Sequence, residues 1–343
     1  MTASTPEFFS LAAEEQREAY RIAADEQGRR DDLVEKDLWV VWALDALFAT
    51  PGVPHMAFKG GTSLSKVFNA IQRFSEDIDV TLNAVELAPD QDVYPDQMSS
   101  KARRRMESLL RERLAAVLTD IVVPHLRARA ADLPVDVTIS DVTDGDIVWV
   151  RYPTVASPVS DYLRSEGVKI EFGGRNAIDP SSRRTIRPYL AHTFPELTLP
   201  TADVDVLSPE RTFWEKFTLA HAESRRAEFK TSERLSRHWY DLARLADQDI
   251  AEHALADRAL LEDVVKIKNL YFRTAYAEYE LCLTGNAALL PDSTGLQVLR
   301  RDYEQMLQAQ MIDEPLDFDA VTHAVQTLQD RTNVAMSEHK VER

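Results

Sequence analysis

Glycine is scarce in this chain, and the position of one glycine pair constrains the fold more than any other feature. The 343 residues include 10 glycines, and four of these form the doublets Gly60-Gly61 and Gly173-Gly174. The first doublet ends the apolar run MAFKGG, and the helix-like TSLSKVFNAIQ and the strand-like IDVTL follow it. This order predicts a strand, a glycine turn, a helix and a second strand. Backbone N–H groups at such a turn can hold phosphate, although an ordinary tight turn would have the same sequence.

Two aspartates stand at alternate positions near the second of these strands. Asp77 and Asp79 lie in RFSEDIDVTL, and Ile78 and Val80 alternate with them. Because side chains two residues apart in a strand point to the same side, both carboxylates should face the glycine turn. Neighbouring carboxylates repel each other unless a cation lies between them, and their oxygens suit Mg²⁺ or Mn²⁺. An exposed acidic edge or carboxylates bonded to arginines are the alternatives, and the upstream doublet favours the metal site.

A third carboxylate is expected on a neighbouring strand, because metal-dependent phosphoryl transfer generally needs one to complete the metal site or to accept a proton. Glu171 in VKIEFGGR is the candidate metal ligand. Lys169 and Glu171 would share the face opposite Ile170 and Phe172. An ion pair between Lys169 and Glu171 is the alternative.

The remaining pattern predicts an α+β fold in two domains. Apolar spacing predicts helices over residues 10–27 and 31–48 and a charged helix over 99–130, with a flexible insertion at 84–97. Four β-rich runs follow, namely VDVTI, DIVWVRY, VKIEF and the weaker TIRPYLAH. Ser208 and Pro209 begin a helix, and the later residues are helical in pattern. We therefore expect a mixed sheet flanked by helices over residues 1–205 and a helical domain over residues 206–343.

The composition limits the partners that this chain can bind. The net charge of −17 repels nucleic acid, so any RNA site must be a local basic run. The candidates are Lys101, Arg103, Arg104 and Arg105; Arg183, Arg184 and Arg187; and Arg225, Arg226, Lys230, Arg234 and Arg237. No apolar stretch is long enough to span a membrane and no signal peptide is apparent, so we expect a cytoplasmic protein. The single cysteine, Cys282, lies in an apolar run typical of a core position.

Five segments of the sequence carry a family resemblance. They are EKDLWV at residues 35–40, FKGGTSLSK at 58–66, RFSEDIDVT at 73–81, SPERTFWEKF at 208–217 and RHWYDLARL at 237–245. Together they resemble the AbiEii/AbiGii nucleotidyltransferase toxins of the polymerase-β-like superfamily, which include the MenT toxins. The resemblance implies a nucleotidyltransferase-type sheet followed by a helical domain.

The resemblance also implies roles for individual residues. Asp77 and Asp79 would bind the metal, and Lys216 and Asp241 would act in the active site. The residues expected to bind the nucleotide are Gly60, Gly61, Thr62, Ser63, Lys66 and Arg73. Arg73 and Lys216 would neutralise charge on the leaving group. Without the resemblance, Lys216 would be assigned to a surface ion pair one helical turn away, and Asp241 to a salt bridge with Arg237.

The implied reaction is metal-dependent transfer of NMP from an NTP to an acceptor. By resemblance the acceptor is the 3′ end of a tRNA, and the protein is the toxin of a toxin–antitoxin or phage abortive-infection system. The tRNA is expected to bind the basic run over residues 183–187 or the one over residues 225–237. Its antitoxin would be separately encoded and need not form a stable complex with it. Transfer to a protein or a small molecule is an alternative, as is a nucleotide-binding regulator without transferase activity. The preferred NTP and the oligomeric state stay open.

Overall fold

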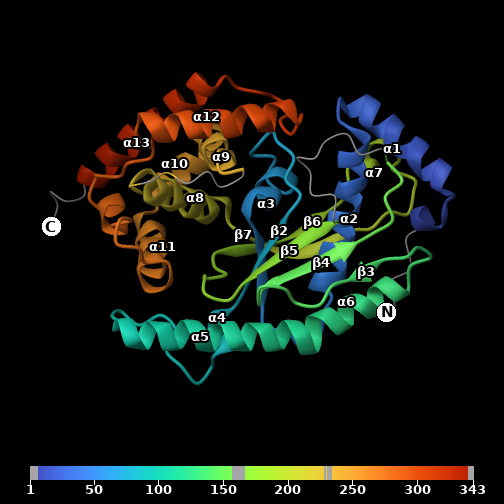
Figure 1. The fold of residues 1–343 in the computed structure, drawn as a ribbon, viewed down its shortest axis with the longest axis horizontal. Coiled ribbons are helices and arrows are strands. Elements are labelled where there is room, and N and C mark those ends of the chain that lie inside the picture. Colours follow the sequence, from blue (N-terminus) through green and yellow to red (C-terminus); the bar gives the residue numbers. More distant parts are fainter. Residues whose placement is uncertain (1–6, 157–166, 228, 230–233, 339–343) are drawn as a thin grey trace. The chain divides into compact units, whose positions relative to one another are not determined.

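The computed structural model describes residues 7–156, 167–227, 229 and 234–338, and it falls into two compact units (Figure 1). Unit 1 comprises Met1–Val67, Phe74–Val93 and Arg105–Leu207. Unit 2 comprises Phe68–Arg73, Tyr94–Arg104 and Ser208–Arg343. The chain passes from unit 1 to unit 2 for the last time after Leu207, two residues beyond the domain boundary expected at 205. The sequence pattern did not reveal that two short segments of the N-terminal half belong to unit 2.

Unit 1 is built on a mixed sheet. Its described strands are β1 (Met56–Lys59), β2 (Ile78–Leu82), β3 (Thr138–Ile139), β4 (Ile147–Arg151), β5 (Val168–Gly173), β6 (Ser181–Ile186) and β7 (Ala202–Leu207). They are arranged in the order β3-β4-β5-β2-β1-β7-β6. The pairs β1–β7 and β2–β5 are parallel, and the other neighbours are antiparallel. The expected class, a mixed sheet with flanking helices followed by a helical C-terminal region, is confirmed.

One face of the central strands forms the core of unit 1. Phe58, Val80 and Phe172 lie in one register row across β1, β2 and β5, and all three are buried. Side chains alternate along a strand, so the residues next to them, Asp79 and Glu171 among them, lie on the opposite face. The strand period predicted this division correctly.

The helices of unit 1 cover the sheet and enclose α2. They are η1 (Glu7–Ser10), α1 (Ala13–Gln27), α2 (Asp31–Phe48), α3 (Gly60–Lys66), α4 (Ala84–Leu87), η2 (Leu118–Val122), α6 (Val123–Ala131) and α7 (Leu190–Thr193). Helix α5 (Ser100–Val117) begins in unit 2 and continues into unit 1. Helix α2 packs against α1, α6, β5 and β7, which explains its apolar sequence. Gly28 ends α1 with a left-handed backbone, φ 64°, at the predicted break.

Some local predictions were wrong. The helix expected to continue to Gln72 ends at Lys66, because the next residues leave for unit 2. The insertion at 84–97 contains α4, whose first turn is capped by the Asn83 side chain. TIRPYLAH contains the end of β6 and most of α7 rather than one strand. Strand β7 was not predicted, although Asp203 and Asp205 alternate with its buried apolar residues as in a strand with one buried face.

Unit 2 is mainly helical. Its helices after residue 207 are α8 (Pro209–Ser224), α9 (Arg237–Leu245), α10 (Asp249–Ala256), α11 (Arg258–Tyr271), η3 (Tyr279–Leu283), α12 (Ser293–Gln308) and α13 (Phe318–Glu338). Helix α8 begins as predicted, with the Ser208 side chain accepting a hydrogen bond from the Arg211 N–H at 3.2 Å. It packs against α9, α10 and α11, and α13 packs against α9. Cys282 is buried. Among the described residues, no helix combines the length and apolar character needed to span a membrane.

Candidate active site

The glycine turn joins β1 directly to α3, and Gly60 has two reasons to be glycine. Its φ is +83°, a left-handed value that residues with a Cβ rarely adopt. A Cβ built on Gly60 would lie 2.2 Å from Asp79 Oδ2. The missing side chain therefore makes room for a carboxylate that the sequence predicts to bind metal.

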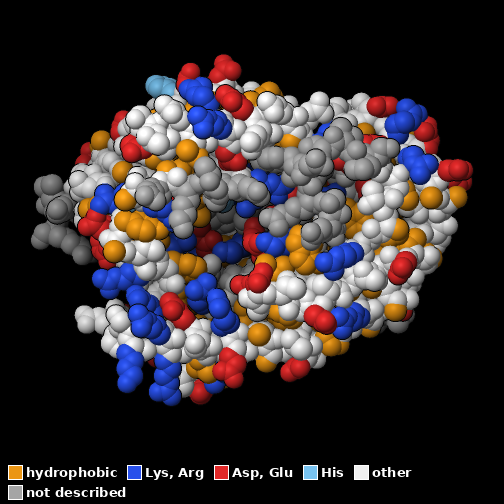
Figure 2. Space-filling view, viewed as in Figure 1, with side chains coloured by type: hydrophobic (Ala, Val, Ile, Leu, Met, Phe, Trp, Pro, Cys, Tyr) orange, Lys and Arg blue, Asp and Glu red, His pale blue; other side chains and the backbone are white. Residues whose placement is uncertain are grey.

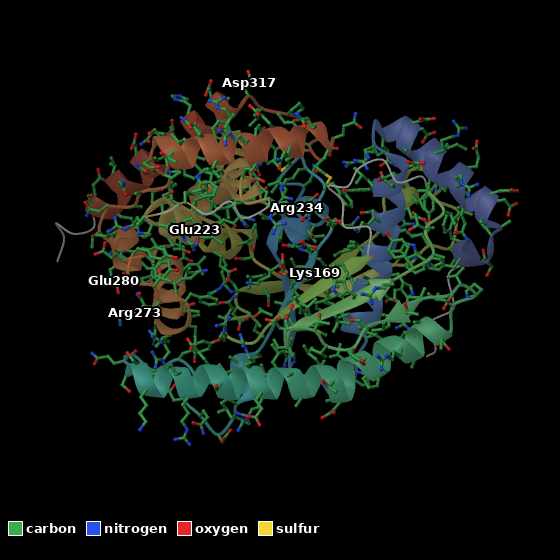
Figure 3. All side chains as sticks on the ribbon, viewed as in Figure 1. Lys169, Glu223, Arg234, Arg273, Glu280 and Asp317 are labelled. Atoms are coloured by element: carbon green, nitrogen blue, oxygen red, sulfur yellow. The ribbon has the colours of Figure 1, made fainter. Side chains whose placement is uncertain are left out.

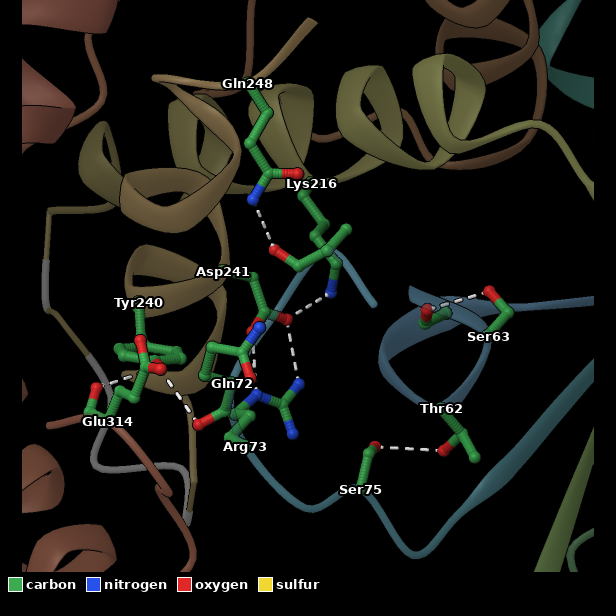
Figure 4. A network of polar contacts seen from close by, with 12 residues as sticks. Thr62, Ser63, Gln72, Arg73, Ser75, Lys216, Tyr240, Asp241, Gln248 and Glu314 are labelled. Atoms are coloured by element: carbon green, nitrogen blue, oxygen red, sulfur yellow. Dashed lines mark hydrogen bonds and ion pairs between the residues drawn. The ribbon is translucent and has the colours of Figure 1, made fainter. Parts of the chain in front are cut away.

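The hydroxyl groups after the doublet hold the turn together. Thr62 Oγ1 donates to the Asp77 carbonyl and lies 3.0 Å from Ser75 Oγ. Ser63 Oγ donates to the Gly60 carbonyl at 3.0 Å (Figure 4). Both side chains are fully buried. Their contacts fix the turn and the start of β2, and in this structure their hydroxyls bond to the chain itself.

The predicted carboxylates lie on adjacent strands. Asp79 is directly opposite Glu171 in the β2–β5 register and opposite Lys59 in the β1–β2 register. These three residues form one row on the face opposite the core. Asp77 lies just before β2, with 5% of its surface exposed. The strand geometry thus brings Asp79 and Glu171 together.

Glu171 also forms the ion pair with Lys169 that was the alternative to metal binding. Its carboxylate forms an ion pair with Lys169 Nζ, two residues earlier in β5. The Lys169 side chain is 10% exposed and that of Glu171 is 41% exposed, so the pair lies at the edge of solvent (Figure 3). Glu171 therefore lies next to Asp79, and the charge of Glu171 is balanced by Lys169.

Lys66, which the sequence predicts to bind the triphosphate, is buried in an ion pair within unit 1. Its ammonium forms an ion pair with Asp37 of α2 and lies 4.2 Å from the centre of the Tyr189 ring. Burial lowers the pKa of Lys66, and the Asp37 charge opposes this shift. Because Lys66 is the last residue of α3, at the end opposite the glycine turn, its side chain packs inside unit 1.

In unit 2, Asp241 holds two cations. Its carboxylate accepts two hydrogen bonds from Arg73, at 2.7 Å and 2.8 Å, and Lys216 Nζ lies 2.8 Å from Oδ2 (Figure 4). The three side chains are 0 to 7% exposed. The alternative of a surface ion pair for Lys216 was therefore wrong, because Lys216 is buried and its partner Asp241 lies on another helix.

The charges of this triad depend on one another. Burial acts to raise the pKa of Asp241, but Arg73 and Lys216 more than offset it and hold the pKa below its usual value. Burial lowers the pKa of Lys216, and the Asp241 charge opposes this shift. Removing any one charge would leave the others buried and unbalanced.

The segment that carries Arg73 is anchored within unit 2. The Gln72 carbonyl accepts from the Tyr240 hydroxyl at 3.1 Å and from the Asp313 N–H at 2.9 Å. Gln248 Nε2 donates to the Ala70 carbonyl at 2.7 Å (Figure 4). The position of Arg73 is thus set by its backbone as well as by its ion pair.

Comparison with known proteins decides the family. The family model described as nucleotidyl transferase AbiEii toxin, type IV toxin–antitoxin system, matches residues 42–326. The chain belongs to the AbiEii family. It is therefore a nucleotidyltransferase of the toxin–antitoxin type, and its family implies an NTP substrate and an antitoxin partner. No curated protein matches.

Two solved structures are similar to this AbiEii chain. MenT4, a nucleotidyltransferase toxin of Mycobacterium tuberculosis H37Rv, has a TM-score of 0.45 and 19% identity, and the likeness covers 93% of this chain and 98% of that one. JHP933 from Helicobacter pylori has a TM-score of 0.44 and 15% identity, with 91% and 96% covered. The family assignment rests on the family model.

Nucleotidyltransferases of this kind generally use a divalent metal, and the AbiEii chain offers two aspartates for it. Asp79 Oδ2 occupies the space above Gly60 that a Cβ would fill, at the turn expected to face phosphate. Among the described residues, no group of three or more His, Cys, Asp or Glu converges to hold an ion. Asp77, Asp79 and Glu171 therefore do not form a three-carboxylate cage by themselves. The donor set fits a hard cation that would take further oxygens from a nucleotide.

Sequence reasoning missed residues on either side of this site. Lys59, directly before the doublet, shares the row of Asp79 and Glu171, which the strand period could have shown. Glu35, Lys36 and Asp37 are buried together in α2. Three successive charges within residues 33–44, which are otherwise apolar, were the available signal, because buried charges need partners.

Proposed function

We propose that this AbiEii toxin transfers NMP from an NTP to the 3′ end of a tRNA, with a divalent metal held by Asp77 and Asp79. The observation that carries the proposal is Asp79 at the glycine turn, with its carboxylate in the space that Gly60 leaves open. Addition to the 3′ end would halt translation, which fits a growth-arresting toxin and a role in phage abortive infection. The separately encoded antitoxin need not form a stable complex with it.

Each part of the site has a proposed task. Backbone N–H groups from Gly60 to Ser63 bind the triphosphate, and Thr62 and Ser63 keep this turn in shape. A bound Mg²⁺ would supply charge neutralisation at the α-phosphate. Glu171 is the third carboxylate beside Asp79.

The residues of unit 2 supply positive charge. Arg73 and Lys216 neutralise charge on the departing pyrophosphate, and Asp241 keeps both cations oriented. Lys66 is the last residue of α3, at the end away from the turn, so we propose that it acts on the nucleotide through the turn.

We propose the first basic run as the RNA surface, in place of the second and third runs that the sequence favoured. Lys101, Arg104, Arg105 and Arg111 are exposed along α5, on the side opposite its buried Met106, Leu110 and Leu114. Figure 2 shows Lys and Arg side chains gathered over the N-terminal part of α5. Cations in the first turns of a helix oppose its dipole, so stability alone does not favour them there. We assign this basic face of α5 to the RNA backbone.

Acidic residues of neighbouring elements or turns accompany the other two basic runs, whereas the acidic residues beside the first run, Glu107 and Glu112, belong to α5 itself. Arg183 on β6 lies 3.3 Å from Asp205, and Asp203 is also opposite this strand. Arg225 and Arg226 form ion pairs with Glu278 and Glu223. Lys230 lies outside the described residues. In these pairs the positive charge of the arginines is balanced by carboxylates, so less of it is left to attract RNA phosphates.

The deciding experiment incubates the protein with total tRNA, Mg²⁺ and each α-³²P-labelled NTP in turn. Wild type should label RNA with a preferred nucleotide, and Asp79→Asn should lose at least about a hundredfold in rate. Asp203→Asn is the matched control, since it changes an exposed aspartate of a similar DVD sequence in β7 and should keep full activity.

Other outcomes would contradict parts of the proposal. Label on protein or on small molecules, but not on RNA, would replace the acceptor. Nucleotide binding without transfer to any acceptor would point to a regulator. Normal labelling by Asp79→Asn would remove the proposed metal site.

A further inference from the structure

Helix α2 carries a buried cation that contacts the residue next to Asp77. Lys36 Nζ lies 2.5 Å from Glu76 Oε2, and the two side chains are 4% and 3% exposed. Glu76 directly precedes Asp77 in the chain. The position of the Asp77 backbone is thus tied to α2 through one side-chain contact.

The next residue of α2 holds a second point of the same region. Asp37 forms an ion pair with Lys66, the last residue of α3, and also accepts a hydrogen bond from the Tyr189 N–H at 2.7 Å. Both charged side chains of this pair are almost completely buried. Asp37 therefore holds the end of α3 through Lys66, and Lys36 holds the residues before β2 through Glu76.

These two contacts bracket the place where the chain leaves unit 1. Val67 is the last residue before the chain passes to unit 2, and Phe74 is the first after it returns. Lys66 and Glu76 stand just outside that interval, and adjacent residues of one helix hold them. The Thr62 hydroxyl, bonded to the Asp77 carbonyl, links α3 to β2 as well.

Stability alone is a weak reason for two buried ion pairs in one helix. Desolvating four charges is costly, and apolar residues of similar volume often stabilise a fold as well or better. Ion pairs add directional contacts between particular atoms, which apolar packing does not. Such contacts are useful where a carboxylate must be held in one position.

We propose that Lys36 and Asp37 form a positioning clamp that fixes Asp77 for metal binding. By holding Glu76 and Lys66, the clamp also fixes the two ends of the segment that carries Arg73. Neither residue is assigned contact with the nucleotide. The clamp rests on the proposed role of Asp77 as a metal ligand. The tie through Glu76 can be tested separately from folding, because both partners can be replaced together.

The test compares Lys36→Met/Glu76→Met with wild type in thermal unfolding, binding of Mn²⁺ alone by EPR, and steady-state transfer. The melting temperature should stay near that of wild type, because no buried charge of this pair is left unpaired. Mn²⁺ affinity and kcat should each fall at least about tenfold, while KM for the NTP changes little. Loss of stability without these changes would indicate a purely structural pair.

The matched control removes another ion pair of the same helix. Arg129 of α6 lies 2.7 Å from Asp45 of α2, away from the residues that flank Asp77. Asp45→Leu/Arg129→Leu should keep Mn²⁺ affinity and kcat. Equal losses in both double variants would overturn the clamp.

Two further variants make every result decisive. If the double variant does not fold, Lys36→Arg keeps the charge but changes its reach, so it should fold and lose kcat several-fold; wild-type kcat would contradict the clamp. If Asp79→Asn abolishes transfer while Lys36→Met/Glu76→Met is fully active, only the clamp fails. Normal transfer by Asp79→Asn would instead refute the proposed function.

Discussion

At Gly60 the backbone conformation and the nearest carboxylate both exclude a side chain. We predict that Gly60→Ala lowers the transfer rate by about a hundredfold, because its methyl group must displace Asp79. The left-handed backbone should also cost about 1 to 2 kcal/mol of unfolding free energy. Transfer assays and urea unfolding measure the two effects.

Gly52 separates the two effects. It has φ +73°, and nothing lies within 4 Å of an added Cβ. Gly52→Ala should therefore lose similar stability and keep its transfer rate. Equal activity losses in the two variants would mean that strain, rather than the Asp79 contact, explains the result at Gly60.

The residue scale also shows where sequence reasoning ends. The alternation of Asp79 with Ile78 and Val80 predicted which side chains face the core, because strand geometry is local. The partner of Asp241 is Arg73, which is 168 residues away in the chain. No local spacing indicates such a contact, so it required the tertiary structure.

At the scale of one element, α2 contains a carboxyl group whose protonation is coupled to folding. Glu35 Oε1 accepts a hydrogen bond from the Val155 N–H at 2.8 Å, and Oε2 accepts one from Ala156 at 3.4 Å. Burial raises the pKa of Glu35 from 4.5 to about 7, although these two backbone donors oppose the shift. The folded protein therefore keeps a proton between these values that the unfolded chain has released. This contribution to stability is complete below pH 4.5 and is lost as the pH rises through 7.

We predict that Glu35→Gln loses this pH dependence. Between about pH 4.5 and pH 8, its free energy of unfolding should decrease by about 3 kcal/mol less than that of wild type. Urea unfolding at the two pH values measures the difference. Glu14→Gln, on the exposed side of α1, should behave like wild type. A Glu35→Gln variant with the full wild-type pH dependence would show that Glu35 is ionised in the fold.

Elements were predicted well where their signals are local and poorly where they are not. Helix α2 and the start of α8 follow from apolar spacing and a Ser-Pro cap. The end of α3 was missed because the chain passes into unit 2 at Phe68, and neither Val67 nor Phe68 is a residue type that signals the end of a helix. Strand β7 is an exception, since it was missed although its aspartates alternate with buried apolar residues, a local signal that the strand period could have shown.

At the scale of the whole molecule, a net charge of −17 means that the proposed RNA acceptor must bind against the overall field. We predict that Lys101→Glu/Arg104→Glu/Arg105→Glu weakens tRNA binding about 10- to 100-fold and lowers the slope of log K against log salt by about 2 to 3. Fluorescence anisotropy without NTP, between about 50 and 200 mM salt, measures both quantities.

The control reverses an equal number of charges on the second basic run. Arg183→Glu/Arg184→Glu/Arg187→Glu changes residues on and next to β6, where Asp203 and Asp205 lie opposite. This variant should bind tRNA almost as wild type does. If it loses binding and the α5 variant does not, the RNA surface belongs at β6.

The alternation of chain segments between the two units has a consequence for synthesis on the ribosome. Arg73 emerges early, but Lys216 and Asp241, its buried companions, emerge more than a hundred residues later. Domains generally fold as units during synthesis, and unit 2 can form only after most of its chain has been made. A nascent or truncated chain that ends before Ser208 therefore carries Asp77 and Asp79 without the completed triad. The ribosome making this toxin would thus finish most of the polypeptide before the proposed transfer to tRNA could begin.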